Sequence, residues 1–150
     1  MPETMIDGYL RERLCARQWR GFLQAMGREF ESALDADDLA LLMGRIGARF
    51  ADANALPAAD DLDAVEAACN AIWSAIDWGW CELDEQDSHV LIRHVCAPLN
   101  AAIDADWADG FLLGVYGRWF QQLGMLPGLG IKRLRSASPD VRHLALQRVS

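Results

Sequence analysis

The sequence lacks the features that mark membrane and secreted proteins. No apolar run reaches the ~18–20 residues that a membrane-spanning helix needs, and the N-terminus has no basic segment followed by an apolar stretch. Cys15, Cys69, Cys81 and Cys96 form no CxxC pair. In a chain of 150 residues we expect them to be buried thiols rather than disulfides. The sequence therefore predicts a cytoplasmic protein that is not embedded in a membrane.

Motifs of catalysis and of nucleotide binding are also missing. The chain has no GxSxG, Walker A or GxGxxG motif, and its three histidines form no arrangement with serine and aspartate. Asp84, Glu85 and Asp87 cluster in a predicted turn, where solvation explains them better than an acid–base pair in a cleft. We predict a protein without enzymatic activity and without a cofactor.

Positive charge is scarce, with 14 basic residues against 22 acidic ones and a net charge of −8. This balance argues against a nucleic-acid partner. Residues 51–90 hold ten acidic residues and no Lys or Arg, whereas residues 131–150 hold five basic residues and one acidic residue. The pattern fits either solvated surfaces or complementary surfaces that meet within or between subunits.

Helical periodicity dominates the N-terminal half of the chain. Apolar residues recur at spacings of three and four over residues 9–30, 36–51 and about 62–76. Gly21 is a candidate break in the first of these helices. The candidate N-cap residues are Asp35 or Asp37 for the second helix and Asp60 or Asp61 for the third.

The period changes to two after Trp78 and Gly79. Residues 80–84 and 89–96 alternate on the two sides of the turn EQDS, which predicts an antiparallel hairpin. A helix follows over about residues 106–123, and residues 131–136 and 141–149 flank a second turn at SPD. The order of N-terminal helices, hairpin, long central helix and second hairpin predicts an α+β fold in one domain over residues 1–150.

Two groups of side chains are candidate binding sites. Cys81, His89, His94 and Cys96 have zinc-binding chemistry, but their spacing is not that of a finger or knuckle, so we predict no metal site. The tryptophans fit a core built around large rings, an interface, or a platform for sugar rings or bases. The tryptophans concerned are Trp73, Trp78, Trp80, Trp107 and Trp119.

The segment DGFLLGVYGRWFQQ at residues 109–122 carries three glycines inside a predicted helix. Each costs the helix about 1 kcal/mol relative to alanine. At about 100° per residue, Gly110, Gly114 and Gly117 lie on one side, where another backbone can approach closely. Another subunit is a candidate for the layer that covers this side of the helix, and the sequence therefore predicts an oligomer. The segment's packing and anchoring residues are Tyr116, Trp119 and Arg118, and Arg118 is expected to need a charged or carbonyl partner.

Four stretches, in this order along the chain, resemble the D subunit family of bacterial cellulose synthase: FLQAM (22–26), GRIGARF (44–50), AIDWGWCELD (75–84) and GVYGRWFQQ (114–122). The resemblance implies a non-enzymatic, cytoplasmic α/β protein whose dimers build an octameric ring. That ring would guide nascent β-1,4-glucan chains at the synthase, with the other synthase subunits as partners. The resemblance also implies glucan contacts near the N-terminus, which makes Tyr9, Arg13 and Arg17 candidates.

Two other functions stay open from the residues alone. The order of helices and hairpins is shared with small-molecule or metal sensors, whose pocket would use the tryptophans and the Cys and His residues of the first hairpin. A hydrolase that acts on glucan through its many acidic residues is the other alternative.

Overall fold

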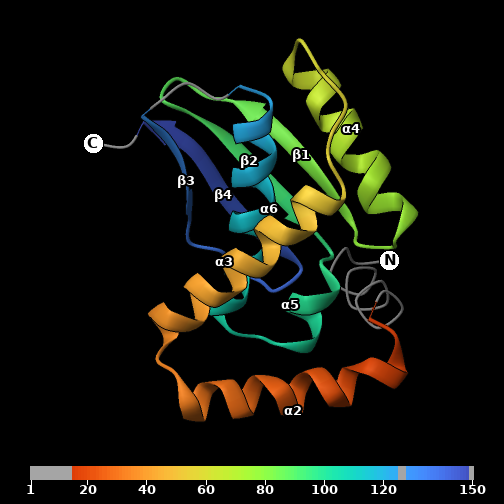
Figure 1. The fold of residues 1–150 in the computed structure, drawn as a ribbon, viewed down its shortest axis with the longest axis vertical. Helices are drawn as coiled ribbons and strands as arrows, with labels where there is room; N and C mark the ends of the chain where they lie inside the picture. The colour runs from red at the N-terminus through yellow and green to blue at the C-terminus, as the bar shows by residue number, and fades with distance from the viewer. Residues whose placement is uncertain (1–14, 125–127, 149–150) are drawn as a thin grey trace.

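The computed structural model describes residues 15–124 and 128–148 (Figure 1). Its order of helices, strands, central helix and further strands confirms the predicted α+β class. The helices are α2 (Arg17–Ala33), α3 (Ala36–Ala53), α4 (Leu62–Ala75), α5 (Pro98–Ala102) and α6 (Asp109–Gln122), with a short 3₁₀ helix η1 (Asp106–Ala108) before α6. The strands are β1 (Trp80–Glu85), β2 (His89–Val95), β3 (Leu129–Arg133) and β4 (Val141–Arg148).

Helices α3 and α4 begin where polar caps satisfy amide groups of their first turn. The Asp35 carboxylate accepts a hydrogen bond of 2.8 Å from the Asp38 amide at the start of α3. The Asp61 carboxylate does the same for Ala64 at 2.7 Å in α4. These bonds select Asp35 and Asp61 from the candidate caps.

The predicted break at Gly21 is wrong, because α2 runs through this residue without interruption. Space around Gly21 is open, with nothing within 4 Å of a Cβ placed there, so neither packing nor backbone strain ends the helix. Residues 9–14 of the predicted helix lie outside the described residues.

Both predicted hairpins are present, and they join in one antiparallel sheet of order β1-β2-β4-β3. The central pairing of β2 with β4 places Val95 opposite Val141 and His89 opposite Gln147. Gly79 starts the first hairpin with φ +74°, and a Cβ at this residue would overlap the Val95 carbonyl oxygen. The change of period at Trp78 and Gly79 therefore marks a turn that only glycine fits.

The helices cover the sheet in successive layers (Figure 1). α6 lies across the sheet, α3 crosses α6 on its outer side, and α4 lies beside β1. α2 and α5 lie together at the end of the molecule shown at the bottom. Sequence periodicity missed α5, since five residues are too few to show a repeat, and it extended α6 over the separate turn η1.

Candidate functional site

The crossing of α3 over α6 brings two backbones into contact. A Cβ on Gly114 would overlap the Gly44 carbonyl oxygen and lie 2.9 Å from the Gly44 Cα. A Cβ on Gly110 would lie 3.0 Å from the Ala40 Cα, and one on Gly47 would lie 2.9 Å from the Val115 amide nitrogen. The bare side of α6 at Gly110 and Gly114 is therefore covered by α3 of the same chain, and the predicted contact with a second subunit at these glycines is wrong.

Gly117 faces a different neighbour. A Cβ on this residue would lie 3.2 Å from the Ile131 Cγ2 atom of β3. On a helical wheel Gly117 lies about 60° from Gly114, which is enough to turn it from α3 toward the sheet. The three glycines thus serve two contacts rather than one.

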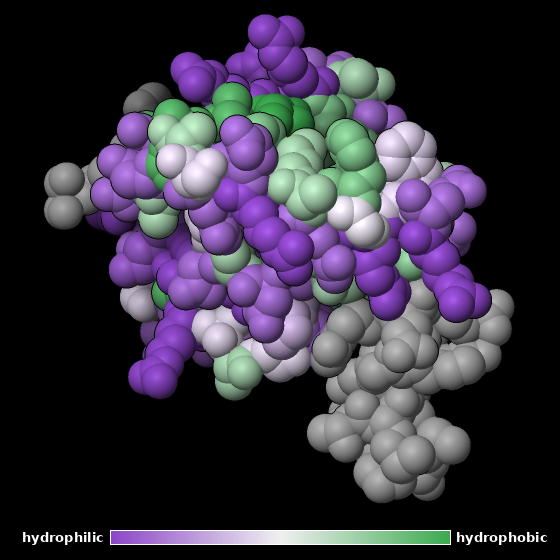
Figure 2. Space-filling model, turned by 90° about the horizontal axis from the view of Figure 1, so that it is seen from below, coloured by the Kyte–Doolittle hydropathy of each residue, from purple (hydrophilic) through white to green (hydrophobic). Residues whose placement is uncertain are grey.

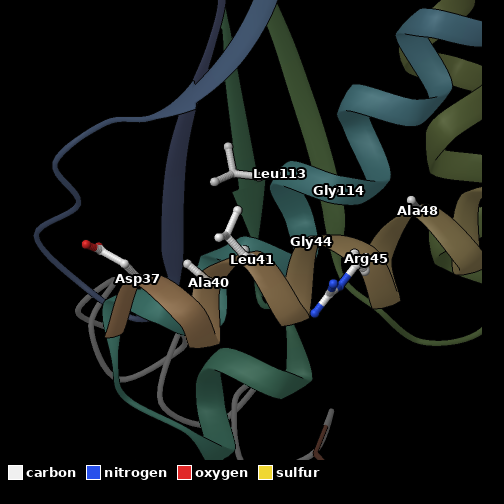
Figure 3. Close-up of a pocket in the computed structure, with 9 residues that line it drawn as sticks. Asp37, Ala40, Leu41, Gly44, Arg45, Ala48, Leu113 and Gly114 are labelled. Atoms are coloured by element: carbon white, nitrogen blue, oxygen red, sulfur yellow. The ribbon is translucent and has the colours of Figure 1, made fainter. Parts of the chain in front are cut away.

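An open apolar groove of about 670 Å³ runs beside this crossing (Figure 3). Leu41 of α3 and Leu113 of α6 point into the same space, and Asp37 and Arg45 lie before and after Leu41 along α3. Leu41 is 68% exposed, the highest fraction among the exposed large hydrophobic residues of the described ranges. The groove is lined by Asp37, Ala40, Leu41, Gly44, Arg45, Ala48, Gly110, Leu113 and Gly114.

Beneath the crossing, a chain of buried hydrogen bonds joins α4, α6 and β2. The Trp73 indole donates to the Tyr116 hydroxyl at 3.0 Å, and that hydroxyl lies 2.6 Å from His94 Nδ1. His94 Nε2 lies 2.8 Å from the Trp78 carbonyl oxygen, which can only accept. His94 is therefore neutral with its proton on Nε2, and Tyr116 donates to Nδ1.

Burial supports this assignment, since it lowers the pKa of His94 to about 4. Every polar atom in the chain of Trp73, Tyr116 and His94 has a partner inside the protein. The edge-on contact of the Trp73 and His94 rings, with centroids 4.8 Å apart, further fixes the imidazole. These groups stabilise the core and have no free atom for a ligand of the sensor type.

Cys69 and Cys81 lie next to Tyr116 of the same network, and all four cysteines are free, buried thiols. Hydrogen bonding to Cys81, and then burial, raise the pKa of the Cys69 thiol far above its usual range. Burial likewise raises the pKa of the Tyr116 hydroxyl. The Cys69 thiol and the Tyr116 hydroxyl are therefore protonated at neutral pH and are unreactive as nucleophiles.

A second polar cluster surrounds the Asp109 carboxylate at the start of α6. Arg142 contacts it with Nε at 2.8 Å and Nη2 at 2.7 Å, and Arg133 donates from Nε at 2.9 Å. Asn100 adds a bond of 3.0 Å, and Asp109 itself is fully buried. This cluster fastens β3 and β4 to α6, so two of the basic residues near the C-terminus pair outside the acidic stretch 51–90.

The other residues of the α6 segment are anchors. The Trp119 indole donates to the Asn54 carbonyl oxygen at 2.9 Å. Arg118 pairs through Nε with Asp52 at 2.7 Å and donates from Nη1 to Gln121 at 2.9 Å. The pair of Arg118 with Asp52 is about half exposed, so its contribution to stability is small.

The residues considered for metal binding do not converge. Cys81 faces His94 across β1 and β2, while His89 pairs with Gln147 at the far end of β2. Cys96 follows β2 with φ +60°. Over residues 15–124 and 128–148, no three His, Cys, Asp or Glu side chains are placed to hold a metal ion. The carboxylates of the β1–β2 turn are exposed to solvent.

Of the glucan-binding candidates, Tyr9 and Arg13 lie outside the described residues, and Arg17 is the exposed first residue of α2. Trp19 and Phe22 on the same helix are 55% and 59% exposed, with ring centroids 6.1 Å apart. Both rings belong to the apolar spacing over residues 9–30, but such a pattern indicates an amphipathic helix and not what covers its apolar face. Figure 2 views the molecule from the end where α2 lies and shows a mostly hydrophilic surface with hydrophobic residues gathered in its upper part.

None of the helices in the described part of the chain is long and apolar enough to cross a membrane.

The comparisons with known proteins bear on the whole chain rather than on one site. A family profile for the D subunit of cellulose synthase matches residues 5–147. No curated protein sequence matches the chain. The profile spans nearly all of the sequence, including the four stretches on which the resemblance depended. The chain belongs to the family of cellulose synthase D subunits.

Proposed function

We propose that this protein is a non-catalytic accessory subunit of bacterial cellulose synthase, which assembles with copies of itself and organises nascent β-1,4-glucan chains for export. The observation that carries the proposal is the family match over residues 5–147. The interior supports it, because the polar groups best suited to chemistry, His94, Tyr116 and Asp109, are buried and hydrogen-bonded to the protein itself.

Self-association into dimers that build an octameric ring is part of this proposal. Its physical support is apolar surface that the chain itself leaves uncovered. Leu41, Trp19 and Phe22 are each more than half exposed, and large exposed apolar groups mark interaction surfaces. We place the assembly in the cytoplasm, next to the synthase complex, with other synthase subunits as partners.

Glucan contact belongs to the N-terminal region in this proposal, with Tyr9, Arg13 and Arg17 as the candidate residues. On α2, the exposed Trp19 and Phe22 rings add two aromatic candidates to this set. Aromatic faces stack on the apolar faces of sugar rings, and guanidinium groups donate to hydroxyl oxygens. An exposed aromatic pair beside an arginine is therefore a suitable contact for a glucan chain.

A deletion strain of the cellulose-producing host tests the proposal. We expect the deletion to lower cellulose yield or disturb the order of the fibres, and the wild-type gene to restore both. Unchanged yield and unchanged fibre order would overturn the accessory role.

The purified protein supplies a second test. Cello-oligosaccharides incubated with it should keep their length, as chromatography of the products will show. Release of shorter sugars would overturn the non-catalytic role and favour the hydrolase alternative.

A further inference from the structure

Leu41 lines the groove beside the crossing of α3 and α6, but its side chain does not fill that groove. The residue projects from α3 and is 68% exposed. The neighbouring groove has glycine backbone at Gly44, Gly110 and Gly114 in place of side chains, and Leu113 forms another part of its wall. A projecting leucine next to an open apolar groove is one half of a contact that a second molecule can complete.

The charges on either side of Leu41 indicate what that molecule is. Asp37 lies four residues before Leu41 and Arg45 four residues after it, so each is about one turn away on the same ridge of α3. Both side chains are exposed, and neither forms an ion pair or hydrogen bond with another residue of the described ranges. The ridge therefore has an acidic end, an apolar centre and a basic end.

Such a ridge is complementary to the same ridge on a second copy whose α3 helix runs in the opposite direction. If two α3 helices lie antiparallel about an axis near Leu41, each Asp37 faces the Arg45 of the other copy. A parallel arrangement would bring equal charges together. Residues four positions apart form a row along a helix, and packing of these rows between two helices is the commonest helix contact in globular proteins.

We propose that a second copy of this chain docks on this groove through α3 in antiparallel orientation, placing its Leu41 in the groove while two Asp37–Arg45 pairs close the ends. The contact is isologous, so one surface serves both partners. The inference rests on the proposed self-association and names the surface that mediates it.

Charge reversal tests this arrangement, with molar mass by light scattering as the readout. Asp37→Arg gives a ridge with two basic ends, and Arg45→Asp gives one with two acidic ends. Each variant alone should associate roughly tenfold more weakly than the wild type, since two favourable pairs become two repulsive ones. An equimolar mixture of the two variants should recover the wild-type mass, because every basic end then meets an acidic end.

The double variant Asp37→Arg/Arg45→Asp should also recover the mass, since it restores both pairs with their signs exchanged. Asp38→Arg and Arg49→Asp are matched controls, because both residues are exposed on α3 but neither lines the groove. Asp37 and Asp38 both lie in the first turn of α3, where a carboxylate interacts favourably with the positive end of the helix dipole. Asp38→Arg therefore loses the same interaction as Asp37→Arg. Both controls should keep the wild-type mass, and circular dichroism should show that every variant is folded.

The outcomes separate this inference from the proposed function. A wild type that is monomeric at all concentrations overturns both. A wild type that associates while the single variants keep its mass shows that self-association uses another surface, and this inference is wrong. Loss of mass in the single variants without recovery in the mixture refutes the antiparallel pairing.

Discussion

Replacing Gly114 by alanine tests whether α3 and α6 touch through their backbones. In an isolated helix the change would stabilise by about 1 kcal/mol. Here the added Cβ overlaps the Gly44 carbonyl oxygen and lies 2.9 Å from the Gly44 Cα, so it meets backbone that cannot rotate away. The matched change on the opposite helix is Gly44→Ala, whose Cβ meets the nearest atom, the Gly110 carbonyl oxygen, at an ordinary 3.7 Å.

The two substitutions should therefore change the free energy of unfolding in opposite directions. Overpacking a close contact costs about 1–3 kcal/mol, and separating the helices also loosens the ring contacts beneath them, such as that of Phe50 with Phe111. For Gly114→Ala we expect the free energy of unfolding to fall by about 2 kcal/mol, which lowers Tm by roughly 4–8 °C in a domain of this size. For Gly44→Ala we expect no loss, and a gain of up to about 1 kcal/mol.

Urea unfolding followed by circular dichroism measures both changes. Every variant must be measured at a concentration low enough to keep it monomeric, because self-association would raise the apparent stability and both glycines line the groove proposed for it. Gly114→Leu should destabilise more than Gly114→Ala, since its larger side chain forces the helices further apart. If Gly114→Ala were as stable as the wild type, or if both alanine variants shifted in the same direction, the backbone contact would be refuted.

The remaining predictions concern buried groups and are measured by the same unfolding assay. Because burial lowers the pKa of His94 from its ordinary value of 6.5 to about 4 in the folded state, the unfolded chain takes up the proton first on acidification. The free energy of unfolding should fall by about 3 kcal/mol between pH 6.5 and 4, and His94→Gln should lack this component. Asp109→Asn should cost about 3 kcal/mol because it removes the fully buried carboxylate of the Arg142 pair and leaves only the largely exposed Asp106, whereas Asp52→Asn, at a half-exposed pair, should cost less than about 1 kcal/mol. Gly79→Ala should cost more than about 2 kcal/mol, since its positive φ and the Val95 carbonyl oxygen both exclude a Cβ.

Local patterns in the sequence predicted most of the secondary structure. The caps at Asp35 and Asp61, the alternation on both sides of the first turn and the helical spacings each depend on a few neighbouring residues. The pairing of β2 with β4 joins segments about 50 residues apart, and no local pattern specifies which strand lies beside which. The sequence therefore predicted two hairpins without predicting the single sheet that they form.

The glycines of α6 likewise show that a local pattern does not specify which distant segment packs against it. A helical wheel gives the direction of a bare side on one helix, but the identity of the neighbour depends on the rest of the fold. Small residues at Ala40, Gly44 and Ala48 recur every four positions on α3, and this spacing matches that of Gly110 and Gly114. Comparing the two helices for small residues at a shared spacing was the available signal that α3 covers α6.

In this protein, the buried polar side chains contribute to stability, whereas the exposed apolar side chains are available for association. His94, Tyr116 and Asp109 are buried with internal partners, so substituting them should alter unfolding first. The side chains of Leu41 and Trp19 project from α3 and α2 with more than half of their surface exposed, so substituting them removes little packing energy. The proposed role of an accessory subunit that works by assembly requires this division, because its partners meet only the outside. Leu41→Ala should therefore weaken self-association while leaving Tm at low protein concentration unchanged, and a large fall in that Tm would show that Leu41 belongs to the core.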